Sequence, residues 1–278
     1  NIMTNFRWDL DLDLYRMPHK FASANMVTGF HSPDTKENWK TLCKKYSDSD
    51  LVKYYKKNPI QYRHNNYGFR TPDDFNDVDT GNVFLGDSYT FGIGYRLEDL
   101  WSYKLSQKLG GKFWNLGQPG TSMGTAVRLM LGWKDYLKID KIFHLIHQFP
   151  RFAVMKPDKS GVFSMAGYNE RNKFRGMEDY SYTWKFFVDV LSQDPHWHYY
   201  CESNLYTIKG IANELGCEYY PIYVDLNQDV EIINEFIGGK DDFINVSSRD
   251  TSPIGKIGGG HQNTGTHLYF YEKFLEML

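Results

Sequence analysis

The chain has 278 residues, of which 41% are hydrophobic and 17% aromatic, and its formal net charge at pH 7 is −2. This length is enough for one large domain, or one domain with an appendage, and for a substantial buried core. The balance of 32 basic and 34 acidic residues excludes a global attraction to nucleic acid or to an anionic membrane and leaves only local charged patches.

The three cysteines are too few and too scattered for a disulfide scaffold, and their spacing matches no metal site. No apolar run approaches the length of a membrane span, and the first residues lack the basic start and the continuous apolar segment of a signal peptide. The chain begins with Asn1 rather than Met, which leaves a removed upstream segment open. We therefore expect a soluble protein.

The first quarter of the chain is predicted to be irregular, with short elements. RWDLDLDLYR, residues 7–16, alternates polar and apolar residues and predicts an edge strand. SPDTKENWKTLCKKY, starting at residue 32, has a capping serine, early acids and late lysines, which predict a helix, and a second short helix is expected at 49–57. IQYRHNNYGFR reads as an extended stretch with a turn at 66–68. We take residues 1–76 as an N-terminal extension packed on a domain that spans 77–278.

From residue 78 onward, strand and helix signals alternate. Strands are predicted at 83–85, 112–116, 141–147, 217–224 and 243–246, and helices at 98–109, 121–137, 181–192, 199–215, 229–237 and 264–278. The stretch from about 149 to 180 is rich in glycine and proline and predicts an insertion that lies over the strand ends. The short connections favour an α/β fold of three layers, with a central parallel sheet between two layers of helices.

The most informative stretch is NVFLGDSYTFGIG, residues 82–94. A short apolar run, typical of a buried strand, ends at Gly86-Asp87-Ser88. Open α/β sheets collect their ligand-binding groups just beyond the strand ends, where helix N-termini offer backbone N–H groups to negative charge. Ser88 is therefore a candidate nucleophile, and the alternative is a serine that only caps a helix.

GDSYTFG resembles the first block of the SGNH, or GDSL-like, hydrolases, and the preceding NNYGFR is similar to the approach segment of a subset of them. The resemblance implies a serine esterase in which Ser88 attacks an ester carbonyl. It also implies an oxyanion hole formed by the N–H groups of Ser88 and Gly120, with Gly117 as the alternative register in NLGQPGTSMG. His261, in GGGHQNTGTH just before the last predicted helix, matches the general base, and His267 is expected to be structural.

Two positions depart from the family pattern. The family usually has an aspartate three residues before the histidine, where this chain has Gly258. Asp250 is the candidate to fold back beside His261; the alternative is a Ser-His dyad whose imidazole is oriented by a backbone carbonyl. The third strand should deliver an asparagine to the oxyanion hole, and Gln148 stands there as a displaced amide donor or as a polar residue at a strand end.

The resemblance thus predicts an esterase that removes O-acetyl groups from a carbohydrate. Two alternatives stay open: a carbohydrate O-acyltransferase on the same fold, and a non-catalytic structural or glycan-binding protein, for example of a phage particle. Asp87 is expected to support the turn, and Arg151 to lie at the surface or to bind a substrate carboxylate or sulfate. The expected partners are an acylated carbohydrate and possible assembly proteins, without nucleic acid or membrane, and no motif indicates a cofactor or a metal. The expected location is the cytoplasm, a virion or an extracellular assembly.

Overall fold

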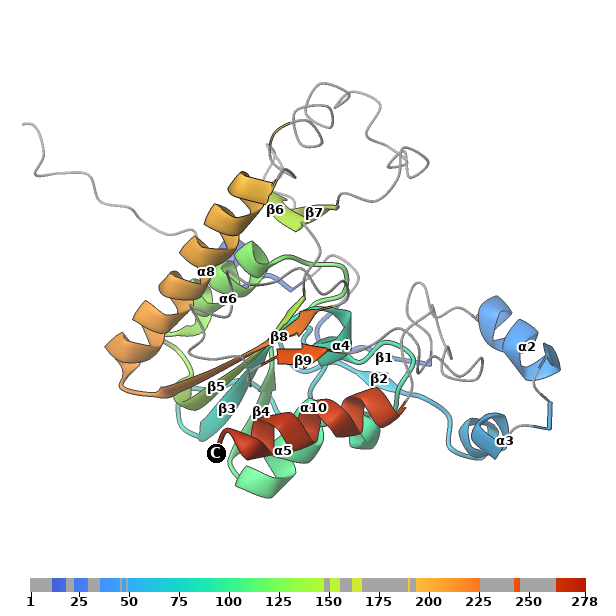
Figure 1. Cartoon of the computed structure of the whole chain (residues 1–278). Coiled ribbons are helices and arrows are strands. Elements are labelled where there is room, and N and C mark those ends of the chain that lie inside the picture. The colour runs from blue at the N-terminus through green and yellow to red at the C-terminus, as the bar shows by residue number, and fades with distance from the viewer. Residues whose placement is uncertain are drawn as a thin grey trace, which may run out of the picture.

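A parallel β-sheet of five strands forms the centre of the computed structural model, in the order β4-β3-β5-β8-β9 (Figure 1). The structure describes residues 12–18, 23–29, 36–45, 47–48, 50–147, 151–155, 162–166, 190, 194–225, 243–245 and 264–278. The strands of this sheet are β3 (Thr80–Leu85), β4 (Lys112–Asn115), β5 (Lys138–His147), β8 (Glu218–Asp225) and β9 (Phe243–Asn245). Each of the five predicted strands is therefore confirmed.

The first core strand, β3, is buried on both faces. Val83, Phe84 and Leu85 are all fully buried, and Val83 pairs with Trp114 of β4 on one side and with Ile142 of β5 on the other. Parallel strands that are covered on both faces read as continuous apolar runs instead of alternating ones. This explains why a run of three apolar residues before Gly86 was a sufficient strand signal.

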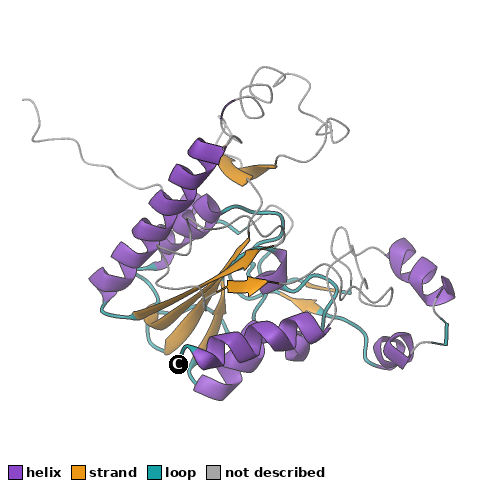
Figure 2. Ribbon diagram, viewed as in Figure 1, coloured by secondary structure: helices purple, strands orange, loops and turns teal. Residues whose placement is uncertain are grey.

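Helices cover both faces of the sheet (Figure 2). On one face α5 (Trp101–Leu109) packs against α10 (Thr264–Glu276), with the rings of Trp101 and Phe274 stacked at a centroid distance of 4.6 Å. On the other face α6 (Met123–Trp133) packs against α8 (Asp194–Leu215). The predicted α/β class, with a parallel sheet flanked by helices, is confirmed.

Several boundaries differ from the prediction. The helix expected at 98–109 is divided into a 3₁₀ turn, η1 (Leu97–Asp99), and α5, because the residue between them, Leu100, has extended backbone angles. The predicted insertion contains a hairpin of two antiparallel strands, β6 (Arg151–Met155) and β7 (Val162–Ala166). The helices predicted at 181–192 and 229–237 lie outside the described residues, apart from residue 190.

The predicted edge strand at 7–16 is wrong over residues 12–16, which form a helix, α1 (Leu12–Arg16). The reason is a tertiary contact with Arg128 of α6, which is 7% exposed. Its guanidinium donates hydrogen bonds to three carbonyls at the end of α1, those of Leu14 (2.7 Å), Tyr15 (2.9 Å) and Met17 (2.9 Å). A helix leaves its last carbonyls without intrahelical partners, and Arg128 supplies them. Burial lowers the pKa of Arg128 to about 10, so that it is cationic at neutral pH.

The rest of the N-terminal part contains the two predicted helices, α2 (Lys36–Lys45) and α3 (Asp50–Lys57), which project from the body of the molecule (Figure 1). Two short antiparallel strands, β1 (Val27–Thr28) and β2 (Tyr62–Arg63), form a second sheet, and the predicted turn at 66–68 follows it. The division of the chain at residue 76 stays a prediction. Within the described ranges, no helix is long and apolar enough to cross a membrane.

Candidate active site

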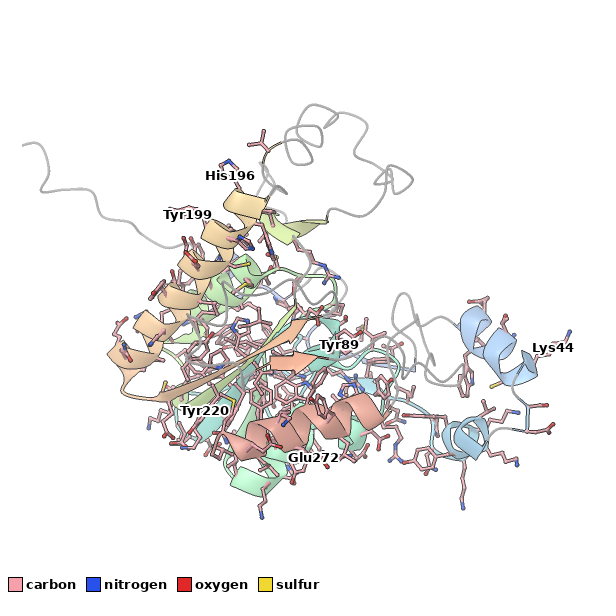
Figure 3. All side chains as sticks on the ribbon, viewed as in Figure 1. Lys44, Tyr89, His196, Tyr199, Tyr220 and Glu272 are labelled. Atoms are coloured by element: carbon pink, nitrogen blue, oxygen red, sulfur yellow. The ribbon has the colours of Figure 1, made fainter. Side chains whose placement is uncertain are left out.

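Ser88 is the first residue of a one-turn helix, α4 (Ser88–Phe91), that begins three residues after the end of β3. The side chain of Asp87 caps this helix, because its Oδ1 accepts a hydrogen bond from the backbone N–H of Tyr89 at 3.0 Å. Ser88 is 7% exposed, and Tyr89 lies at the same turn (Figure 3). The predicted position of Ser88, at the carboxyl end of a buried parallel strand, is therefore present.

The turn requires glycine at position 86. Gly86 has a φ of +147°, and a Cβ there would lie 2.1 Å from Thr90 Oγ1 and 2.9 Å from the carbonyl oxygen of Leu145. Thr90 Oγ1 in turn donates to the carbonyl of Leu85 at 3.2 Å. Any side chain at this position would push α4 away from the end of β3, so the glycine sets how closely Ser88 follows the strand.

The far end of α4 is held by Arg70, which is 1% exposed. Its Nη1 donates to the carbonyls of Phe91 (2.9 Å) and Gly92, and its Nη2 donates to the carbonyl of Tyr95 (2.6 Å). The guanidinium also lies over the ring of Tyr62, 4.3 Å from its centroid. These carbonyls belong to the end of the helix and to the segment that follows it, where a cation is electrostatically favourable. Sequence reasoning missed this contact.

The glycine-rich turn after β4, residues 115–124, lies against the Ser88 turn. Gln118 N–H donates to the carbonyl of Gly86 at 3.0 Å, and the side chain of Asn115 donates to the carbonyl of Thr90 at 3.1 Å. Asn115 is fully buried, and its Oδ1 accepts a hydrogen bond from the N–H of Gly117 at 3.0 Å. The two turns that the sequence singled out are therefore joined directly by hydrogen bonds.

The surroundings of the two candidate oxyanion glycines differ. A Cβ on Gly117 would lie 2.7 Å from Phe91 N and 2.7 Å from Thr90 Cβ, so the chain passes too close to α4 for a side chain. The Gly117 N–H already donates to Asn115. Gly120, by contrast, is exposed, has a φ of +67°, and would have nothing within 4 Å of an added Cβ. Gly120 is therefore the more accessible of the two donors.

Arg151, the first residue of β6, pairs with Asp87 and not with solvent alone. Its Nη1 lies 3.1 Å from Asp87 Oδ2 and 3.5 Å from the carbonyl oxygen of Thr121. The carboxylate of Asp87 is almost entirely buried and the guanidinium largely so. The expectation of a surface arginine is therefore wrong: Arg151 ties the β6–β7 hairpin to the Ser88 turn and to the glycine-rich turn.

A pocket lies next to this ion pair, at the carboxyl ends of β3 and β5. Its polar and aromatic lining consists of Asp87, Thr121, Ser122, His144, Arg151 and Trp197. Burial lowers the pKa of His144 to about 3, and its Nδ1 lies 2.9 Å from Tyr219 Oη. This imidazole is neutral at physiological pH, so Arg151 supplies positive charge to the pocket and Asp87 balances it. The described residues contain no cluster of histidine, cysteine, aspartate and glutamate that would hold a metal ion.

The remaining predicted site residues, Gln148, Asp250 and His261, lie outside the described residues, as does Gly258. The chain becomes described again at Thr264, where α10 begins three residues after His261. His267 in α10 is 1% exposed and accepts a hydrogen bond from the Trp101 N–H at 3.4 Å, in agreement with a structural role. Comparison of the chain with protein-family models and with curated proteins found no match.

Proposed function

We propose that the protein is a serine esterase of the SGNH type that removes O-acetyl groups from a carbohydrate. The observation that carries this proposal is the joined pair of turns: Ser88 begins a helix at the carboxyl end of a parallel strand, and the turn that contains Gly120 is hydrogen-bonded to it through Gln118. Ester cleavage needs a nucleophile and N–H donors for the oxyanion close together, and this arrangement supports both.

In the proposed reaction, Ser88 Oγ attacks the carbonyl carbon of the acetyl ester while His261 takes the serine proton. The carbonyl oxygen becomes an oxyanion that accepts hydrogen bonds from the N–H groups of Ser88 and Gly120, with Gln148 as a further donor. Collapse of this intermediate breaks the bond to the sugar oxygen, which receives the proton from His261. Water then attacks the acetyl-serine with the same histidine as base, and acetate leaves. Asp250, or a backbone carbonyl, orients the imidazole.

The contacts around Ser88 are suited to this chemistry because they are already made by the resting protein. Asp87 caps α4, Arg70 holds its far end, and Arg151 restrains Asp87. Donors that are held in place before the substrate arrives need no reorganisation at the moment of reaction, and such electrostatic preorganisation is usually the largest contribution to catalysis.

The test compares the wild type with Ser88→Ala on p-nitrophenyl acetate and on an acetylated polysaccharide, with Ser106→Ala as the matched control. Ser106 lies in α5, and its buried hydroxyl meets no hydrogen-bond partner within the described part of the chain. We expect Ser88→Ala to lose at least about 10³-fold in rate, since triad serines contribute more than this, and the control to match the wild type. A fluorophosphonate should also label Ser88, located by mass spectrometry of the peptides.

The competing functions give other results. If acetyl transfer to a sugar hydroxyl requires a donor and water is a poor acceptor, the protein is an acyltransferase on the same serine. If neither substrate is cleaved above the Ser88→Ala background and the fluorophosphonate does not react, the esterase proposal fails and a structural or glycan-binding role takes its place.

A further inference from the structure

The two helices that project from the body carry a concentration of positive charge. We call residues 36–57, which contain α2 and α3, the basic arm. It holds seven lysines and three acidic residues, a net charge of +4, whereas the rest of the chain has a net charge of −6. Six of these lysines have exposed side chains: Lys36, Lys40, Lys44, Lys53, Lys56 and Lys57. The chain as a whole is close to neutral, so this segment differs from the rest in the sign of its net charge.

The lysines are spaced so that they share helix faces. Lys36, Lys40 and Lys44 follow each other at intervals of four residues on α2, about 6 Å along the axis, and Lys44 points away from the body (Figure 3). Lys53, Lys56 and Lys57 have the same kind of spacing on α3, while Val52 and Tyr55 on its other side are buried. Each helix therefore presents a row of ammonium groups to solvent.

The two helices are in contact with each other through aromatic residues. The ring of Trp39 on α2 meets that of Tyr55 on α3 edge to face, with centroids 6.5 Å apart. The neighbouring Tyr54 is 40% exposed and lies beside the exposed lysines of its own helix. The arm thus combines cationic groups with an accessible aromatic ring, and aromatic faces stack well on sugar rings.

The arm is attached to the segment that continues from the Ser88 helix. Tyr55 Oη donates to Asp99 at 3.4 Å, and Arg96 donates to Tyr54 Oη at 2.8 Å. Asp99 and Arg96 lie a few residues after Gly92, whose N–H donates to the carbonyl of Ser88 at 2.8 Å. The arm is therefore anchored to the segment that follows the helix of the candidate nucleophile.

We propose that the basic arm binds an acidic polysaccharide, one with carboxylate or sulfate groups along its length, and holds it near Ser88. This inference rests on the proposed function and names the class of substrate: an O-acetylated acidic polymer. A row of flexible ammonium groups suits a ligand with charge repeated along a chain, because each lysine acts as a point charge and needs no fixed geometry. The net negative charge of the rest of the molecule repels the same polymer and directs it to the arm.

The test is a binding measurement that does not depend on catalysis, made with Ser88→Ala protein. The probes are polygalacturonate, neutral dextran and a 20-base-pair DNA duplex, each in low and moderate salt. The test variant combines Lys36→Gln, Lys40→Gln and Lys44→Gln in the arm. The control makes the same change at three exposed lysines elsewhere, Lys108, Lys138 and Lys209, and thermal unfolding verifies that both variants fold.

We expect polygalacturonate to bind and dextran not to bind, with an affinity that falls as salt rises. The arm variant should bind polygalacturonate at least about tenfold more weakly, because charge steering raises association rates by about 10- to 1,000-fold. The control variant should bind with the affinity of the parent protein. The proposal is overturned if the arm variant binds like the control, if dextran binds equally well, or if the DNA duplex binds more tightly than polygalacturonate.

The outcome is separate from that of the esterase test. Hydrolysis of p-nitrophenyl acetate, a small neutral ester, reports on Ser88 alone, whereas binding of polygalacturonate reports on the arm alone. A protein that binds the acidic polymer but cleaves no ester would contradict the proposed function and leave the arm as a glycan-binding surface. A protein that cleaves the small ester but ignores the polymer would contradict only the inference about the arm.

Discussion

Replacing Arg70 by methionine should destabilise the protein strongly, because the guanidinium is buried and satisfies several carbonyls at once. Its three short contacts go to the carbonyls of Phe91, Gly92 and Tyr95. Methionine has a similar length and its thioether packs on aromatic rings, but it has no charge over the ring of Tyr62 and donates no hydrogen bond. Each buried carbonyl left without a donor costs about 1–3 kcal/mol. The variant does not have to bury a charged guanidinium, and the desolvation cost that it avoids offsets part of this loss. We expect a net loss of about 3–5 kcal/mol.

The assay is equilibrium unfolding in urea, followed by tryptophan fluorescence. With a slope of about 3 kcal/mol per molar, the midpoint should fall by roughly 1–1.7 M. Arg63→Met is the matched control: it makes the same chemical change at an exposed residue of strand β2 and should stay within about 0.5 kcal/mol of the wild type. Labelling of Ser88 by a fluorophosphonate should also slow in Arg70→Met. If the midpoint moves no further than in the control, Arg70 does not hold the end of α4 and this reasoning is wrong.

Three further predictions concern the same end of the sheet. His144→Phe should remove a pH dependence of stability. The pKa of His144 in the folded protein is about 3, below the ordinary 6.5, so this histidine lowers the free energy of unfolding by about 1.4 kcal/mol per pH unit as the pH falls from 6.5 towards 3. The free energies of urea unfolding at pH 7 and pH 5 should therefore differ less in the variant than in the wild type. Gly117→Ala should cost about 2 kcal/mol or more in the same assay and slow ester cleavage, because the new Cβ meets the backbone of Phe91 at 2.7 Å; unchanged values would mean that the two turns are not packed as described. Arg151→Met leaves the buried carboxylate of Asp87 without its cation and should cost about 3 kcal/mol of stability, measured by thermal unfolding. The double variant Arg151→Met with Asp87→Asn should recover part of this loss. If the stability losses of the two single variants simply add in the double variant, the ion pair is contradicted.

The sequence was sufficient for the sheet because its signals are local. Buried parallel strands are continuous apolar runs, and Val83 to Leu85 before a glycine mark such a strand without knowledge of the fold. The helices that follow have apolar spacing, which is equally local. The position of Ser88 at the end of β3 follows from these two patterns alone.

The contacts that hold Ser88 in place were not predictable in the same way. Arg70 bonds carbonyls 21 to 25 residues further along the chain, and Arg151 pairs with a carboxylate 64 residues before it. Arginine is a surface residue in most proteins, so the sequence does not indicate that an arginine is buried. Backbone carbonyls have no sequence signature, so the sequence does not indicate which of them accept its hydrogen bonds. Asn115 has a weak signal, since it is a polar residue at the end of a predicted buried strand.

The wrong prediction at residues 12–16 has the same cause. Alternating aspartate and leucine favours a strand over such a short stretch, but the choice was made by Arg128, more than 110 residues away, which bonds the carbonyls of a helix. Tertiary contacts override the local sequence pattern most easily in short helices and strands, because a short element has few local interactions of its own to stabilise one conformation.

The attachment of α1 to α6 has a consequence for the order of folding during synthesis. Leu14 leaves the ribosome 114 residues before Arg128, its partner. At 5–20 residues per second, the N-terminal segment waits roughly 6–23 s for the surface on which it docks. Through that interval Leu14, which is buried in the finished protein, is exposed to other chains and to chaperones. Helix α1 is thus made before the first two strands of the sheet and α6, and it docks only after they have been translated.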